Sequence, residues 1–519
     1  MTESPEQSPR RALLRLVDLL SRPNRTVLLT LLGLALLTRL LWVLWIHPPS
    51  AYVFSDMHGY VTRALRLVEH GFQPGTRDLA WQSYGTHYLL AGILAIVGKA
   101  NLYAAGVVWG LMGASVIPMA YALAARVCTR PWMAAVVGFA ALLWHPNLVT
   151  TGFFTSETPA LCFGVWATWR LAVLLQDGRG ALQAGVAAAF AFALRPQLAV
   201  FFTLTVVLWA FTRWRGGTTA KLGQVLVVGA CLAGIFGFSL WRFHEHTGTW
   251  GGIAEAANAN RTAARCHNAR TQAFRTKAQL DRSRSVDDGR LIGIIPFQTR
   301  MRKISHEHFL GMRPALGTRA RAFTIEVERK DGTREWIPVR IAKDGFGIKF
   351  VGYIGDPDIH RALQRLCIER TGPLEQLRYA FVNLTGLWIY NSQWPDSSRN
   401  REYFHRYSKA FIVIFNAVVL LPSMLGIALA LRRRRENPAL VLCALQLLGL
   451  YFVSSFFFGS IRLRTPYDVF ALVLAVEGYA WIAGVIARRR AARRVAGSQV
   501  PQDRSSEPPT PARASARAG

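Results

Sequence analysis

Long apolar stretches separated by short polar connections fill both ends of the sequence. Ten of them reach or approach the roughly 20 apolar residues that a helix needs to cross a bilayer. They lie at 27–46, 102–125, 131–150, 157–175, 181–194, 198–212, 222–241, 409–431, 438–458 and 467–487. The pattern predicts an α-helical polytopic membrane protein with about ten transmembrane helices.

The apolar stretch at 88–97 is shorter and follows a polar, aromatic segment, so we expect it to lie in the membrane interface. Short cytoplasmic loops carry an excess of Lys and Arg. With the N-terminus inside, all the predicted cytoplasmic connections contain Lys or Arg: 126–130, 177–180, 213–221, 432–435 and the tail from 488. Counting 88–97 as a span would place the arginines at 432–435 outside, which favours the ten-span topology.

Composition and charge agree with a membrane protein. Of the 519 residues, 51% are hydrophobic, and the formal net charge is +31. This charge would suit a nucleic-acid binder, but the basic residues cluster beside apolar spans, where they orient helices. We therefore expect membrane lipids, and no nucleic acid, as partners.

The topology divides the chain into five parts. These are a basic cytoplasmic N-terminus (1–26), a bundle (27–241) with a first outer loop (47–101), an extracytoplasmic loop domain (242–408), further transmembrane helices (409–487) and a basic disordered tail (488–519). The apolar run after residue 26 lacks a cleavage site, so the first helix is expected to be retained. The N-terminus itself suits either a helix on the anionic leaflet or a disordered tail.

The loop domain reads as a mixed α/β unit. Residues 323–329 and 336–341 alternate in polarity around Lys330-Asp331-Gly332, which predicts a β-hairpin, and 359–370 is helical in pattern. The domain holds 28 Lys and Arg against 17 Asp and Glu, but long loops are translocated largely regardless of charge. Its two cysteines, Cys266 and Cys367, either form a disulfide in an oxidising compartment or remain free thiols.

The other four cysteines lie in or beside apolar spans, where they are expected to act as small packing residues. They are Cys128, Cys162, Cys231 and Cys443.

Isolated charges occur at the ends of apolar segments, all on the predicted outer side. Asp56, with Tyr60 one turn later, follows the first span, and Glu157 begins the fourth. Charges near hydrocarbon are costly, which favours a functional reading. Helix capping is the structural alternative, because acidic residues favour the first turn of a helix.

Three outer arginines are harder to explain structurally. Arg195 precedes Pro196 at an outer turn, and Arg462 and Arg464 lie between the last two spans. The positive-inside rule disfavours arginine on this side, so we expect an anionic partner. Guanidinium groups bind phosphate through paired, charge-assisted hydrogen bonds.

Together these motifs resemble the GT-C superfamily of polyprenyl-phosphate-sugar-dependent glycosyltransferases, which includes protein O-mannosyltransferases and lipid A aminoarabinose transferases. The resemblance rests on Asp56 with Tyr60, Thr155-Ser156-Glu157, 194–197 and 461–466, in this order. It implies a GT-C-like bundle in a bacterial inner membrane. There, a sugar would pass from a polyprenyl-phosphate donor to a lipid, glycan or protein acceptor at the extracytoplasmic face. Many relatives carry an Asp-Glu pair where this chain has Asp56-Met57.

On this reading Asp56 is the general base that accepts the proton of the acceptor hydroxyl. Arg195, Arg462 and Arg464 stabilise the departing phosphate, and Tyr60 belongs to the substrate site.

Glu157 either orients the acceptor or assists a divalent cation, although no His/Asp cluster has metal-ligand spacing. His58 and His87 are further candidates near the site, and each is more simply read as a surface or interfacial histidine. No other cofactor is expected.

Other functions fit parts of the pattern. A transporter or lipid flippase would also place charges near the membrane surface, although no internal repeat is visible. A scaffold anchored by its helices would leave the outer arginines without a role. Within the enzyme class, an oligosaccharide ligase or polymerase would use a diphosphate-linked donor.

Overall fold

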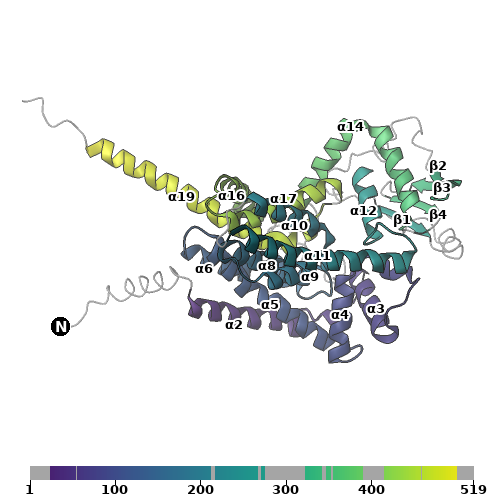
Figure 1. Cartoon of the computed structure of the whole chain (residues 1–519), viewed down its shortest axis with the longest axis horizontal. Coiled ribbons are helices and arrows are strands. Elements are labelled where there is room, and N and C mark those ends of the chain that lie inside the picture. The colour runs from purple at the N-terminus through teal and green to yellow at the C-terminus, as the bar shows by residue number, and fades with distance from the viewer. Residues whose placement is uncertain are drawn as a thin grey trace, which may run out of the picture.

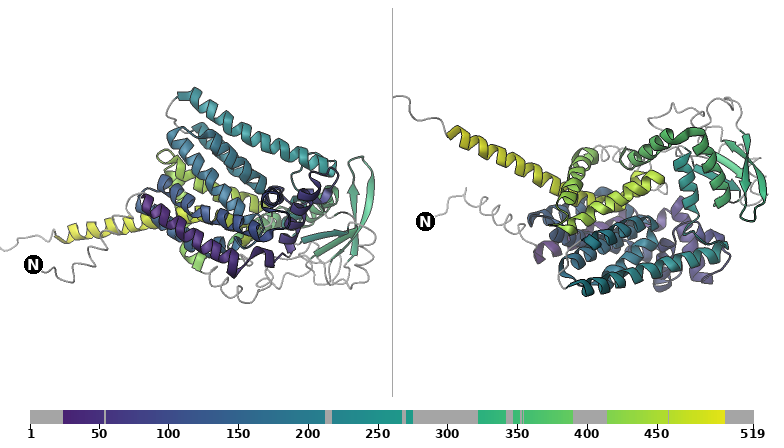
Figure 2. Two further views of the ribbon diagram at one scale, coloured as in Figure 1. Left: turned by 90° about the horizontal axis from the view of Figure 1, so that it is seen from below. Right: turned by 45° about the horizontal axis from the view of Figure 1, so that its top comes forward.

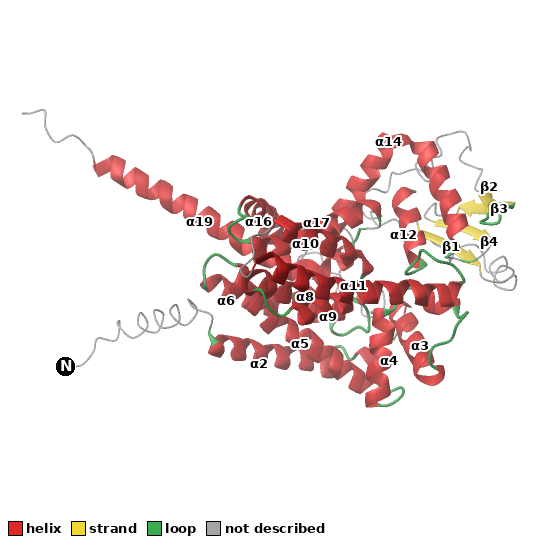
Figure 3. Ribbon diagram, viewed as in Figure 1, coloured by secondary structure: helices red, strands yellow, loops and turns green. Residues whose placement is uncertain are grey.

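The structure is a computed structural model that describes residues 24–53, 55–211, 217–266, 270–274, 322–341, 347–351, 353, 355–389, 414–457 and 459–498. Helices make up most of this part of the chain, and the strands gather at one end of the molecule (Figure 3). The predictions for the N-terminal segment 1–23 and for the tail from 499 fall outside the described residues.

Among the described residues, six helices are long and apolar enough to cross a membrane. They are α2 (Arg25–Leu41, continued by η1, Trp42–Ile46), α5 (Leu102–Val127), α8 (Glu157–Asp177), α11 (Gly217–Thr247), α17 (Pro438–Phe456) and α19 (Asp468–Ser498). Shorter apolar helices fall in the remaining predicted spans: α6 (Trp132–Leu143), α9 (Ala181–Leu194), α10 (Ala199–Phe211, preceded by η4, Pro196–Leu198) and α16 (Leu421–Arg432, preceded by η6, Asn416–Leu420). The predicted helical bundle is therefore confirmed (Figure 1).

The helix α4 (Gly85–Val97) corresponds to the stretch expected in the interface. It is as short as α6 and α10, and it packs against the amphipathic helix α3 (Ser55–His70). Its position in the interface stays a prediction.

Two predicted boundaries were wrong. The span at 131–150 is broken at Trp144, which is extended, and a separate helix α7 (His145–Thr150) follows. Pro146 lacks a backbone N–H, and its ring would clash with the carbonyl group four positions earlier in a continuous helix, which ends α6. Residues 488–498, predicted to be disordered, continue α19 because Ala and Arg are strong helix formers.

Small residues let the helices of the bundle approach closely. Gly426 of α16 lies against the backbone of Leu474, and Gly478 of α19 lies against the backbone of Pro422. A Cβ atom at either glycine would collide with the neighbouring helix. Such contacts replace the hydrophobic driving force that is absent between helices in lipid. Figure 2 shows these helices side by side in the bundle.

The domain predicted to be extracytoplasmic (242–408), called the outer domain below, contains a four-stranded sheet in the order β1 (Arg270–Phe274), β4 (Gly347–Val351), β3 (Arg334–Ile341), β2 (Ala322–Glu328). The predicted hairpin is confirmed as the antiparallel pair β2–β3, and β1 is parallel to β4. The inward face, which includes Val327 and Val339, packs with α12 (Ala256–Arg265) and α14 (Pro357–Ile389). α14 bends at Gly372, whose φ of 76° favours glycine, and at the following Pro373.

Cys266, at the end of α12, and Cys367, in α14, form a disulfide. Of the two alternatives that the sequence left open, the structure has the bonded one. The bond closes a loop with a sequence separation of 101 residues.

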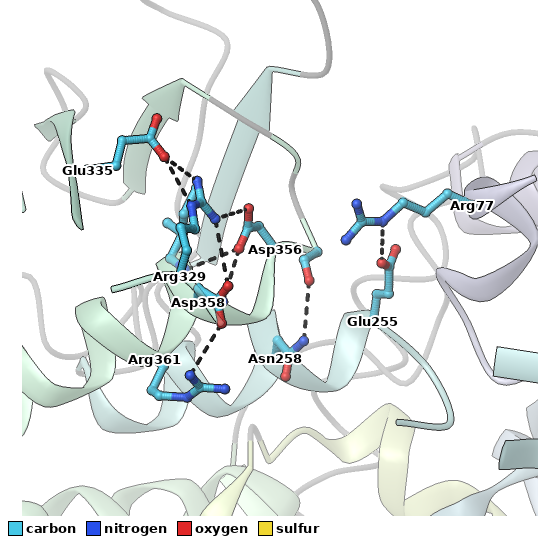
Figure 4. A network of polar contacts seen from close by, with 10 residues as sticks. Arg77, Glu255, Asn258, Arg329, Glu335, Asp356, Asp358 and Arg361 are labelled. Carbon is cyan, nitrogen blue, oxygen red and sulfur yellow. Dashed lines mark hydrogen bonds and ion pairs between the residues drawn. The ribbon is translucent and has the colours of Figure 1, made fainter. Parts of the chain in front are cut away.

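An ion pair joins the outer domain to the first outer loop. Arg77 Nε donates to Glu255 Oε1 at 2.6 Å, and the Arg77 guanidinium lies 4.1 Å from the centre of the Tyr353 ring. Within the domain, Arg329 binds Glu335 and Asp356, and Asp356 accepts backbone N–H groups from the first turn of α14 (Figure 4). These contacts hold the domain over the end of the bundle that carries α3 and α4.

We expect replacement of both bonded cysteines, Cys266→Ser with Cys367→Ser, to destabilise the outer domain. Closing a loop of about 100 residues is worth roughly 4.7 kcal/mol on the chain-entropy model. Limited proteolysis of the full-length protein should cut the variant within the outer domain faster than the wild type. Cys128→Ser, which leaves the disulfide intact, serves as the control; equal cleavage of the double variant and this control would contradict the prediction.

Candidate functional site

Four charged side chains from four separate segments meet at one end of the bundle. Asp56 lies in the first turn of α3, Glu157 begins α8, Arg195 follows α9, and Arg462 lies in the short helix α18 (Ile461–Arg464). Arg462 Nη1 donates to Asp56 Oδ2, and Arg462 Nε donates to Glu157 Oε1, each at 2.7 Å. These contacts join residues 406 and 305 positions apart.

Arg195 ties the cluster to its neighbouring backbone. Its Nη2 lies 3.2 Å from Glu157 Oε1 and 3.3 Å from Ser156 Oγ, and its Nη1 donates to the carbonyl oxygen of Leu463 at 3.1 Å. The residue is extended at the end of α9 because Pro196 follows it. Arg195 thus holds the segment that carries Arg462.

A glycine in α4 fixes the end of α9. Gly85 lies directly against the backbone of Ala193 and Leu194, where a Cβ atom would collide. The close approach fixes the chain immediately before Arg195.

Exposure divides the cluster into two layers. The side chains of Asp56 and Arg462 are 46% and 20% exposed, whereas those of Arg195 and Glu157 are 4% and 2% exposed. Burying a carboxylate is costly unless it is paired, and Glu157 is paired with two guanidinium groups. The inner pair, Glu157 and Arg195, therefore supports an outer pair, Asp56 and Arg462, that a substrate can reach.

Tyr60 lies one helical turn beyond Asp56 and is buried beside the cluster. Burial, together with the negative charges of Glu157 and Asp56, raises the pKa of Tyr60 to about 12. Its hydroxyl therefore keeps its proton at neutral pH and can act as a hydrogen-bond donor.

Arg464 does not join these residues. Two positions along a helix turn the side chain by about 200°, so Arg462 and Arg464 point to opposite sides of α18. Arg464 Nε donates to Asp468 Oδ1 at 2.8 Å, and its Nη1 donates to the carbonyl oxygen of Leu387 at 2.9 Å. It is 1% exposed. Arg464 therefore lies apart from Arg462, and its charge is paired with Asp468 inside the protein, which argues against the expectation that it binds phosphate there.

Aromatic rings complete the surroundings of this second ion pair. The Arg464 guanidinium lies 3.7 Å from the centre of the Phe415 ring, and Trp144 Nε1 donates to Asp468 Oδ2 at 2.8 Å. The sequence analysis missed Asp468. The spacing of four residues between Arg464 and Asp468 is the signal that indicates the pair.

The two histidine candidates have different surroundings. His58 is exposed, as expected, with Nε2 3.4 Å from Thr62 Oγ1. His87 is fully buried, so its reading as a surface histidine was wrong. Burial, reinforced by the positive charges of Arg63 and Arg242, lowers the pKa of His87 well below its usual value.

The cluster does not fit a divalent cation. Within the described residues, no group of three or more His, Cys, Asp and Glu side chains could hold a metal ion. The two carboxylates that would be its ligands, Asp56 and Glu157, are bridged by the Arg462 guanidinium.

Replacement of Arg464 should destabilise the protein more than replacement of Arg462. Arg464→Met leaves Asp468 buried without its cation, and breaking a buried pair costs about 3–5 kcal/mol. In Arg462→Met, Glu157 keeps Arg195 as a partner, so the loss should be smaller. Unfolding of both variants in the same detergent measures the difference, and an equal or reversed order would refute the assignment of Arg464 as structural.

The buried His87 should make stability depend on pH. The pKa of His87 is depressed in the folded state, so the folded protein binds the proton less readily than the unfolded chain. The free energy of unfolding is therefore highest above the unfolded pKa of about 6.5 and falls as the pH drops below it, by at most about 1.4 kcal/mol per pH unit. We expect His87→Gln to reduce this slope between pH 7.5 and 5.0, measured by thermal unfolding at constant ionic strength. His58→Gln, an exposed control, should leave the slope unchanged; an identical slope in His87→Gln and wild type would contradict the effect.

No protein-family model matches the chain, and no curated protein is significantly similar to it in sequence. Among solved structures, the chain is similar to the oligosaccharyltransferase of Archaeoglobus fulgidus in the apo form, with a TM-score of 0.43 and 12% identity, covering 92% of this chain and 53% of that one. The complex of the same organism's oligosaccharyltransferase AglB with an inhibitory peptide and a dolichol-phosphate gives a TM-score of 0.41 and 12% identity, covering 92% and 52%.

ArnT from Cupriavidus metallidurans bound to undecaprenyl phosphate gives a TM-score of 0.34 and 14% identity, covering 87% of this chain and 77% of that one. The chain spans about half the length of the two oligosaccharyltransferase structures. Identities of 12–14% and TM-scores below 0.5 support no statement about the family or activity of this chain. The function is therefore argued from the residues of the site.

Proposed function

We propose that this protein is a membrane glycosyltransferase that transfers a sugar from a polyprenyl-phosphate donor to a lipid, glycan or protein acceptor at the extracytoplasmic face of a bacterial inner membrane. The observation that carries the proposal is the outer pair Asp56–Arg462, a carboxylate and a guanidinium in contact at 2.7 Å. One group can accept a proton and the other can stabilise a phosphate, which are the two needs of this reaction.

In the proposed step, the acceptor hydroxyl oxygen attacks the anomeric carbon of the donor sugar. The new C–O bond forms as the bond between that carbon and the phosphate oxygen breaks, and the phosphate keeps the electron pair. Asp56 accepts the hydroxyl proton as general base. Arg462 donates hydrogen bonds to the phosphate, whose negative charge grows as it departs.

The contact between Asp56 and Arg462 suggests an order of binding. Arg462 uses Nη1 and Nε for the two carboxylates, and no described residue accepts from its Nη2. A phosphate bound to Nη1 and Nη2 would take a paired geometry that guanidinium favours. Donor binding would thereby draw Arg462 from Asp56 and leave the carboxylate to the acceptor.

The remaining residues have supporting roles in the proposal. Glu157 and Arg195 position Arg462, and the protonated Tyr60 supplies a hydroxyl beside the two carboxylates. The charges lie at helix ends, whereas transporter sites lie near the middle of the membrane at breaks in helices. This placement favours the transferase over the transporter or flippase.

The central test is Asp56→Asn, which removes the base but keeps a similar shape. We expect transfer to fall by about 10²–10⁴-fold, the usual contribution of general base catalysis, while expression and membrane insertion remain normal. Cells that carry the variant should accumulate the lipid-linked sugar, which would also identify the donor.

Glu69→Gln is the matched control, because Glu69 lies in the same helix and is exposed. It should retain normal transfer and donor levels. Near-normal turnover in Asp56→Asn would remove Asp56 from the role of base.

A further inference from the structure

A second basic site lies at the opposite end of the bundle. Glu157 and Asp177 are the first and last residues of α8, whose 21 residues extend about 30 Å. Beside its far end a pocket of about 510 Å³ opens between α2, α5 and α8. This pocket has no part in the proposed transfer reaction.

Arginines dominate the polar lining of the pocket. Arg126 and Arg179 both bind Asp177, at 2.9 and 3.3 Å. Arg25 and Arg170 also line the pocket, and neither has an ion pair within the described part of the chain. Arg170 Nε is buried without a hydrogen-bond partner there. Four arginines against one carboxylate leave a strong excess of positive charge.

The remaining walls are apolar and aromatic. Leu28, Ala122 and Val173 line the pocket and belong to helices long enough to span the membrane. Tyr121 accepts a hydrogen bond from the backbone N–H of Asn24 at 2.8 Å, which fixes the start of α2 at the rim. Trp169, next to Arg170, also lines the pocket, as is typical of side chains at the level of lipid headgroups.

We propose that this pocket binds the phosphate headgroup of an anionic phospholipid, with acyl chain packed along α2, α5 and α8. The arginines would bind the phosphate, and the apolar wall would contact the chain. A free anion would use only the first of these surfaces. Basic pockets between transmembrane helices are known to hold anionic headgroups. The proposal is independent of the transferase function.

The test measures the binding of phosphatidylglycerol to the delipidated full-length protein by native mass spectrometry. The variant Arg25→Gln with Arg170→Gln removes two charges without breaking an ion pair. At about one kcal/mol for each basic residue, binding should weaken roughly thirtyfold. The matched control, Arg435→Gln with Arg490→Gln, removes two exposed arginines and should change binding less than twofold.

Phosphatidylcholine and inorganic phosphate are the comparison probes. We expect neither to bind as tightly as phosphatidylglycerol. Equal weakening of binding in the control variant would overturn the proposal, because it would show a diffuse effect of charge. Inorganic phosphate that binds as tightly as the lipid would also overturn it, because the site would then be one for a free anion. If the double variant does not fold in phosphatidylcholine, the single variant Arg25→Gln is tested instead. Its affinity for phosphatidylglycerol should fall about fivefold. An unchanged affinity would refute the site.

Discussion

The buried carboxylate of Glu157 imposes the strictest constraint on this molecule. A carboxylate with 2% exposure requires cationic partners in fixed positions, because an unpaired charge in such a place would cost several kcal/mol. Arg195 and Arg462 supply them, so the start of α8, the end of α9 and the turn at α18 must converge. Because Arg462 is held by Glu157, the same pairing fixes the position of the outer pair Asp56–Arg462.

A second buried pair makes the orientation of α18 unique. Arg464 reaches Asp468, the aromatic rings and the carbonyl of Leu387 on one side, while Arg462 reaches the carboxylates on the other. Rotation of this short helix would separate both pairs at once. Gly459, which lies directly against the backbone of Asn383, brings the same segment against α14. The outer domain and the charge cluster therefore share one structural support.

Hydrophobic periodicity predicted the bundle and the hairpin. All four cluster members were singled out as isolated charges at the ends of apolar segments, and two of them, Arg195 and Arg462, as arginines that the positive-inside rule leaves unexplained. The errors have physical causes. Topology assigns a residue to a side of the membrane but not to a side of its helix, so Arg464 was grouped with Arg462. The burial of His87 depends on how α4 packs, which local sequence does not contain. The break at Trp144 was hidden because a local proline effect interrupts an otherwise continuous apolar run.

The long sequence separation across the cluster also bears on biosynthesis. Arg462 emerges 406 residues after Asp56, which at about 5–20 residues per second is a delay of roughly 20–80 s. Until then Glu157 has Arg195 as its cationic partner in the cluster, and the outer carboxylate lacks the guanidinium that faces it. The protein therefore completes its charge network only when its last helices reach the membrane, so an incompletely synthesised chain remains without a finished site.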